Sequence, residues 1–68
     1  MKIMLNNKQE NLEGINKLTV NELLSLKKFS FRMLIIKINN VLIKKDKYDK
    51  TVIYNGDNVS VIHLIAGG

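Results

Sequence analysis

Few side chains in this sequence could do chemistry by themselves. The chain has no cysteine and one histidine, His63, so cysteine nucleophiles, disulfides and histidine metal clusters are excluded. Any nucleophile that needs a histidine base would depend on His63, and a lone histidine in a strand is more often a partly buried packing residue. We therefore assign His63 no role, and we expect neither a metal site nor enzymatic activity.

The residues of greatest chemical interest are the last two, Gly67 and Gly68. Glycine makes up about 7% of an average sequence, so a glycine pair at a chosen end occurs by chance in about one chain in 200. The ordinary explanation is a frayed tail. Such a tail does not usually follow directly on a strand as apolar as residues 59–65. We therefore predict that residues 66–68 form an extended, functional tail.

Basic side chains are in excess, with 11 lysine and arginine residues against 6 acidic ones and a net charge of +5. This excess is typical of proteins that bind nucleic acid or anionic membranes, but the A/T-rich codons of lysine, isoleucine and asparagine offer another explanation. The densest run, residues 44–50, holds one aromatic residue, Tyr48, whereas RNA is normally bound by several stacking aromatics. We interpret the run as an exposed, irregular crossover and do not expect nucleic acid as a partner.

Length and hydropathy favour one globular domain, residues 1–68. Hydrophobic residues make up 46% of the 68, which is enough for a core, and no second domain fits. No apolar run approaches the roughly 18 to 20 residues of a membrane span, and residues 3–5 are too few for a signal peptide. We therefore expect a soluble, cytoplasmic protein with no membrane partner.

The elements that would position the tail begin with a hairpin and a helix. Residues 1–5 alternate with a period of two up to the turn-prone pair Asn6-Asn7, and the polar residues 8–13 predict the return strand. Residues 19–22, Thr-Val-Asn-Glu, form a capping box, so a helix is predicted from Val20 to about Lys27-Lys28.

Three later stretches predict the remaining strands. Residues 32–38 are apolar on both faces, as in a strand inside a sheet, and Asn39-Asn40 predicts a tight turn into a strand at 41–44. A turn at residues 55–57 precedes a last strand over 59–65.

In this last strand Val59 and Val61 are expected to face the core. Ser60, Ile62 and Leu64 then lie on the opposite face, where exposed apolar side chains often mark a partner surface. Packing against a neighbouring strand explains them about equally well.

The predicted order is strand, strand, helix, strand, strand, crossover, strand. This order gives an α+β fold, a ubiquitin-like β-grasp with a mixed sheet of about five strands and one main helix packed on one face. A small OB-type barrel is the structural rival, but its helix would come later, between the third and fourth strands.

With this order and the terminal glycines, the chain resembles the ThiS family of sulfur-carrier proteins over its full length. The matching residues lie at 18–20 with 23–24, at 38–39 with 41, at 55–57 with 59, and at 65–68. The departures from the family pattern are Asn40 for glycine, Lys44 for proline, Tyr48 for tryptophan and Asn55 for aspartate. These departures affect turns and packing, not the tail.

The resemblance implies that Gly68 reacts through its main-chain carboxyl group, while Gly67 and Ala66 thread into a partner. A ThiF-like adenylyltransferase would activate the carboxylate with ATP and magnesium, and a sulfur donor such as a cysteine desulfurase would supply the sulfur of a C-terminal thiocarboxylate. A ThiG-like thiazole synthase would receive that sulfur. The carrier itself would bind no cofactor and catalyse nothing.

Other functions remain open at this stage. The small subunit of molybdopterin synthase and ubiquitin-like protein modifiers also end in Gly-Gly. An RNA-binding or regulatory β-grasp module is the alternative from a different class, and its binding would fall steeply with salt.

Overall fold

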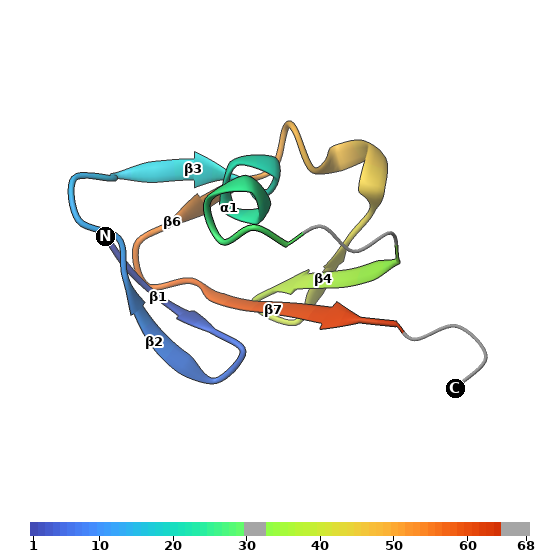
Figure 1. Ribbon diagram of the computed structural model, residues 1–68, viewed down its shortest axis with the longest axis horizontal. Helices are drawn as coiled ribbons and strands as arrows, with labels where there is room; N and C mark the ends of the chain where they lie inside the picture. Colours follow the sequence, from blue (N-terminus) through green and yellow to red (C-terminus); the bar gives the residue numbers. More distant parts are fainter. Residues whose placement is uncertain (30–32, 65–68) are drawn as a thin grey trace.

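A computed structural model describes residues 1–29 and 33–64 of the chain, which form two sheets and a helix (Figure 1). The larger sheet has five strands in the order β2-β1-β7-β4-β5. These strands are β1 (Lys2–Leu5), β2 (Lys8–Asn11), β4 (Leu34–Ile38), β5 (Val41–Ile43) and β7 (Asn58–His63). The strands β1 and β7 run parallel and the other neighbours run antiparallel, so the sheet is mixed, as predicted.

Both hairpins of the large sheet turn at a pair of asparagines. Asn6 and Asn7, between β1 and β2, have φ angles of 51° and 67°, and Asn39 and Asn40, between β4 and β5, have φ angles of 50° and 69°. Two successive positive φ angles are what a type I′ turn requires, and asparagine tolerates them better than most residues. Both turns lie where the sequence placed them.

The helix α1 (Val20–Leu26) begins at the predicted capping box. The backbone N–H of Glu22 donates to the hydroxyl of Thr19 at 3.1 Å, and the carboxylate of Glu22 accepts from the backbone N–H of Thr19 at 2.7 Å. Each side chain thus satisfies a backbone donor that the first turn of a helix leaves unpaired. Val20 and Leu23 point from this helix into the core.

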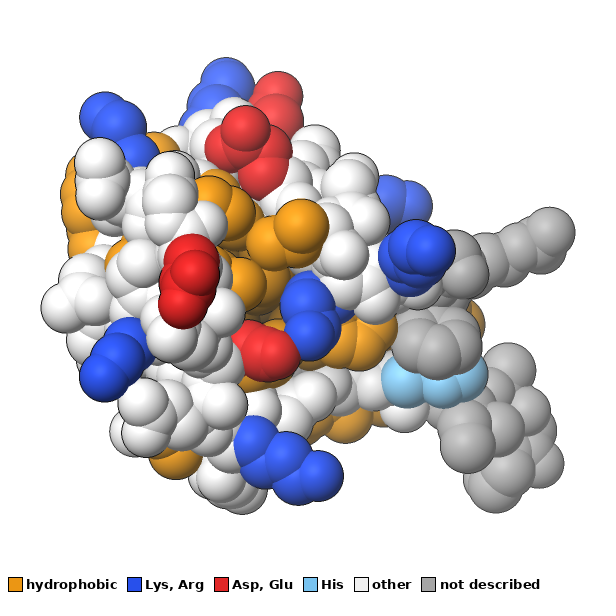
Figure 2. Space-filling model, turned by 60° about the vertical axis from the view of Figure 1, so that its left-hand side comes forward, with side chains coloured by type: hydrophobic (Ala, Val, Ile, Leu, Met, Phe, Trp, Pro, Cys, Tyr) orange, Lys and Arg blue, Asp and Glu red, His pale blue; other side chains and the backbone are white. Residues whose placement is uncertain are grey.

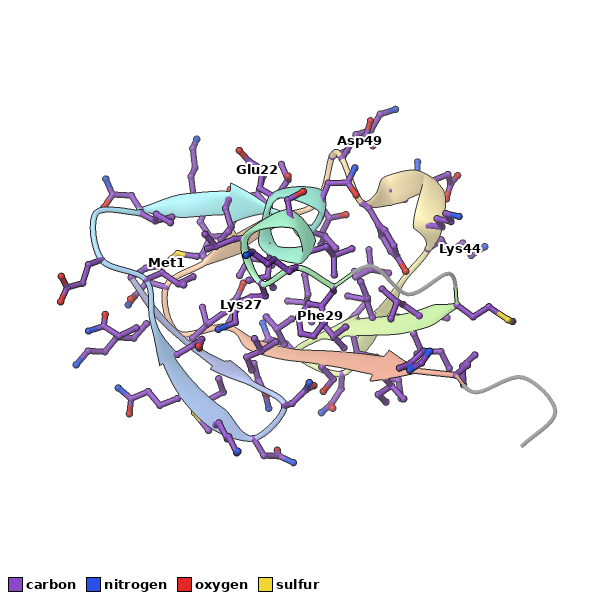
Figure 3. The ribbon with its side chains drawn as sticks, viewed as in Figure 1. Met1, Glu22, Lys27, Phe29, Lys44 and Asp49 are labelled. Carbon is purple, nitrogen blue, oxygen red and sulfur yellow. The ribbon has the colours of Figure 1, made fainter. Side chains whose placement is uncertain are left out.

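The end of α1 is closed by backbone hydrogen bonds at Lys27-Lys28, where the sequence predicts the end. Phe29 N–H donates to the carbonyl of Leu24 at 2.8 Å and Lys28 N–H to that of Ser25 at 3.2 Å, while Lys28 has a φ of 59°. This is a Schellman motif with a lysine at the left-handed position that glycine usually occupies. The motif directs Phe29 between α1 and the strands of the large sheet (Figure 3).

The core lies between α1 and one face of the five-stranded sheet. The pairings Leu5 with Val59, Ile38 with Val59 and Ile36 with Val61 place side chains of β1, β7 and β4 on this face. Leu23 of α1 is fully buried against it. The alternation predicted for residues 1–5 and for Val59 and Val61 is therefore correct, and β4 lies inside the sheet between β7 and β5.

A two-stranded sheet of β3 (Lys17–Thr19) and β6 (Val52–Tyr54) was not predicted. These strands pair antiparallel beside α1 (Figure 1), and Val20 N–H, at the start of the helix, donates to the carbonyl of Thr51 at 3.0 Å. Each strand has only three residues, which is too few for a period of two to stand out.

The crossover at 44–50 is more ordered than we predicted. It contains the 3₁₀ helix η1 (Lys45–Lys47), and Tyr48 belongs to the hydrophobic core, with 8% of its surface exposed. The carbonyl of Tyr48 accepts from Asn21 N–H at 3.0 Å, and burial raises the pKa of its hydroxyl above the ordinary value. The aromatic ring therefore anchors the crossover to the start of α1.

Candidate functional site

The candidate site begins where β7 ends. This strand lies in the middle of the large sheet, and its pairing with β4 extends to His63 opposite Leu34, followed by a hydrogen bond of 3.0 Å from Leu64 N–H to the carbonyl of Met33. β7 is thus paired up to the residues that precede the predicted tail. Ile65 and the tail residues Ala66, Gly67 and Gly68 lie outside the described residues.

The face of the large sheet opposite α1 carries apolar side chains. We call this surface the open face and define it by the residues at its outward positions on four strands: Met4, Ile35, Lys37, Leu42, Ser60 and Ile62. Ile62 is 46% exposed and Leu42 57%. Ile35 and Ser60 are partly buried. Large apolar side chains that share one exposed face are typical of a surface that meets another protein.

Four of the open-face residues were not identified from the sequence: Met4, Ile35, Lys37 and Leu42. Met4 and Ile35 lie on strands far apart in the chain, and the strand pairing places Ile35 opposite Ile62 and Leu42 opposite Lys37. The alternation of residues 1–5 already places Met4 opposite the core side chains. The two-residue turn at Asn39-Asn40 fixes the register of its hairpin, so this signal could have placed Leu42 on the same face as Lys37.

The charged side chains of the open face are cationic. Lys37 lies on β4 between the positions of Ser60 and Leu42, and Lys2 shares the outward side of β1 with Met4. At the outward positions of the five strands, as the described pairings define them, there is no aspartate or glutamate. A partner that covers this face needs apolar side chains at its centre and would gain from carboxylates near the two lysines.

Leu64 and His63 are both exposed at the end of β7. Leu64 is 40% exposed, as its predicted place away from the core requires. His63 was expected to be a partly buried packing residue, and that expectation is wrong, because it lies beyond the edge of the packed core. Its position on the same side as Val61 follows the alternation, but His63 belongs neither to the core cluster nor to the side chains packed against it.

A hollow of about 530 Å³ lies at the end of the sheet where α1 meets β4 and β5. Among the described residues its apolar lining includes Leu24, Phe29, Leu34, Ile43 and Tyr48. Lys44 and Lys45 stand beside it. The hollow offers a binding surface, and its described lining residues bring no acid and base together.

On one face of the molecule (Figure 2), the basic side chains of the described residues do not form a continuous patch. On the face in Figure 2, the lysine side chains of the described residues are spread around the molecule and separated by uncharged and acidic ones. Within residues 1–29 and 33–64, no three His, Asp or Glu side chains are grouped so that they could hold a metal ion. In the same ranges, no helix has the length and apolar character to cross a membrane.

The fold and the site together define a class of protein. One main helix packs on one face of a five-stranded mixed sheet, and the central strand of the sheet precedes the Gly-Gly end of the sequence. This arrangement defines a small β-grasp protein of the ubiquitin-like kind. The model of the ThiS family matches residues 3–68, and the chain belongs to that family.

Solved structures agree with this assignment. The crystal structure of the thiamine biosynthesis protein ThiS from Geobacter metallireducens is similar with a TM-score of 0.90 and 28% identity, over 100% of both chains. The solution structure of a thiamine biosynthesis protein from the same organism has a TM-score of 0.82 and 28% identity, over 100% of this chain and 88% of that one. No curated protein matches the chain. The family supports a small carrier protein of thiamine biosynthesis rather than a catalyst.

Proposed function

We propose that this protein carries sulfur for the thiazole part of thiamine, and that its reacting group is the main-chain carboxyl of Gly68. The observation that carries the proposal is the match to the ThiS family over residues 3–68, which includes the Gly-Gly end. The place of β7 in the middle of the sheet adds support, because the tail then follows a strand that has a paired neighbour on each side.

The chemistry requires activation of the carboxylate. A terminal carboxyl group has a pKa of about 3.5, so at neutral pH it is an anion that a sulfur nucleophile does not attack. In the proposed reaction a ThiF-like adenylyltransferase joins one carboxylate oxygen to the α-phosphorus of ATP, with magnesium, and pyrophosphate leaves. Sulfur from a donor such as a cysteine desulfurase then displaces AMP and leaves a thiocarboxylate. The glycines at 67 and 68 have no Cβ, so they fit a narrow channel.

The open face, together with Leu64, is the proposed surface for the partners. Ser60, Ile62 and Leu64 lie in or directly after β7, close in sequence to the tail. We call the end of β7, from which the tail starts, the root of the tail. An enzyme that binds the open face can therefore bind the tail at the same time. The adenylyltransferase and a ThiG-like thiazole synthase both need the tail, so we propose that they use this face in turn. The carrier provides the reacting carboxylate and the surface that docks it in the partner's active site, and the partners catalyse the reaction.

The first experiment measures the intact mass of the protein after incubation with ATP, magnesium, the activating enzyme of its source organism and a sulfur donor. We expect one oxygen atom to be replaced by sulfur at the C-terminus. The control is a reaction in which the same enzyme preparation adds sulfur to a different carrier protein. An unchanged mass of this protein, when the control carrier is modified, would contradict the proposal. A product joined to lysine side chains of other proteins would instead favour a ubiquitin-like modifier.

A second experiment tests whether Gly68 is the reacting end. Adding one alanine after Gly68 leaves the described core untouched but moves the carboxylate by one residue, roughly 3.3 to 3.6 Å. Misplacement by about 1 Å can reduce a rate on the order of 100-fold. We therefore expect ATP–pyrophosphate exchange to be nearly lost, with an unchanged thermal midpoint. Deleting Gly68 should have the same effect, and exchange at the wild-type rate in either variant would exclude Gly68.

The RNA-binding alternative has little to support it. Tyr48, the aromatic residue of the basic run 44–50, is buried and cannot stack on a base. Lysine side chains without stacking partners give only weak, salt-sensitive binding.

A further inference from the structure

The parallel ladder between β1 and β7 continues beyond the last residue of β1. Met4 N–H donates to the carbonyl of Asp57 at 2.9 Å, and Asn6 N–H donates to that of Val59 at 2.9 Å. Parallel strands use every second residue in such a series, so the next acceptor on the β7 side is the carbonyl of Val61. The chain turns into β2 at Asn6-Asn7, so the β1 backbone ends before it could supply the next donor.

The side chain of Asn6 supplies the missing pairing. Its Nδ2 donates to the carbonyl of Val61 at 3.1 Å, and its Oδ1 accepts from the N–H of Val61 at 2.8 Å. A carboxamide has the same donor and acceptor as a peptide group. It therefore supplies both the acceptor and the donor that the backbone of a longer β1 would offer to Val61.

This pairing acts on the part of β7 that leads to the tail. Backbone bonds from β1 and its turn hold β7 as far as Val59, and the Asn6 carboxamide extends the hold to Val61. On the other side β4 pairs with β7 through His63. At Val61 the strand is thus held from both sides.

We propose that Asn6 is a positioning residue for the reaction at Gly68: its carboxamide fixes the last part of β7, and thereby the point from which the tail reaches into the adenylating partner. The inference rests on the proposed function. Glycine-rich segments adopt many conformations, so the partner can guide the tail correctly only if its root has a fixed place on the sheet.

The two asparagines of the turn provide a matched pair of variants. Asn6→Gly removes both hydrogen bonds to Val61, while glycine tolerates the φ of 51°. Asn7→Gly is the control, because Asn7 has a similar φ of 67° and, among the hydrogen bonds of the described residues, its side chain makes none to β7. Asn6→Asp is a third variant that keeps the acceptor and loses the donor.

The first measurement is hydrogen exchange of the Val61 amide, followed by NMR on the free protein under conditions where all variants are folded. We expect exchange at Val61 to be about tenfold or more faster in Asn6→Gly than in Asn7→Gly, because the N–H loses its acceptor. Asn6→Asp should exchange at a rate closer to that of the wild type. Equal exchange in Asn6→Gly and Asn7→Gly would overturn the inference that the carboxamide fixes β7.

The second measurement is the steady-state kinetics of adenylation. A misplaced tail root should lower kcat of Asn6→Gly by about 10- to 100-fold with KM little changed, because the open face still docks. Simple loss of stability would lower the folded fraction and raise the apparent KM without changing kcat. Kinetics equal to those of Asn7→Gly, despite faster exchange at Val61, would overturn the positioning role.

The two measurements also separate this inference from the function on which it rests. If the wild-type protein is not adenylated by its source organism's activating enzyme, the proposed function fails and the positioning role fails with it. Faster exchange at Val61 in Asn6→Gly would then show that the hydrogen bonds hold β7 for some other purpose.

Discussion

Leu23 shows how much of the stability of a short chain depends on one side chain. It is fully buried at the centre of α1, and the core cluster to which it belongs includes residues of β1, β4 and β7. Chains of this length have a free energy of unfolding of only about 3 to 10 kcal/mol. We expect Leu23→Ala to cost about 2 to 5 kcal/mol, because it removes buried methyl groups and leaves a cavity.

Leu26 on the same helix is the matched control, since it is 49% exposed. Leu26→Ala should cost less than about 1 kcal/mol. Urea titrations of the two variants measure the difference. Equal losses would mean that the buried side of α1 is misassigned.

The helix as an element depends on how its two ends are closed. The capping box at Thr19 is close to ideal, whereas the Schellman motif places Lys28, a residue with a Cβ, at a φ of 59°. Glycine adopts this conformation without strain. Lys28→Gly should therefore raise the free energy of unfolding by about 0.5 to 1 kcal/mol, despite the loss of a cation near the helix end.

Lys28→Ala separates the two effects, because it removes the charge and keeps the strained conformation. We expect it to be no more stable than the wild type in thermal denaturation. If Lys28→Ala gained as much stability as Lys28→Gly, the gain would come from the charge and not from the backbone.

At the scale of the whole molecule, the large sheet has one face buried against α1 and an open face that is the proposed partner surface. Val61 and Ile62 are neighbours on β7, yet Val61 is 6% exposed and Ile62 is 46% exposed. We expect Ile62→Asp to leave the thermal midpoint nearly unchanged and to weaken binding to the adenylating partner at least about tenfold, because a charge replaces an apolar contact. Binding is measured by titration calorimetry.

Val61→Asp is the control for this prediction and should unfold the protein, since it buries an unpaired charge. An Ile62→Asp variant that is also unfolded would assign Ile62 to the core. A folded variant with full affinity would remove Ile62 from the partner surface.

The sequence by itself determined the local structure. The capping box at Thr19, the asparagine pairs at both turns and the alternation around Val59 and Val61 depend on neighbouring residues, so they could be identified from the sequence. The order of the elements was sufficient to predict the fold class. The period of the last strand placed Ile62 and Leu64 on the side away from the core, and the structure then showed that both are exposed.

Only the tertiary structure decided which distant residues meet. The strands β3 and β6 are too short to be recognised alone and form because they pair with each other. Tyr48 is buried because the crossover packs against α1, and no charge pattern in 44–50 indicates that contact. The open face and the bond between Asn6 and Val61 join residues from opposite ends of the chain, and their pairing depends on the register of the sheet, which no local pattern encodes.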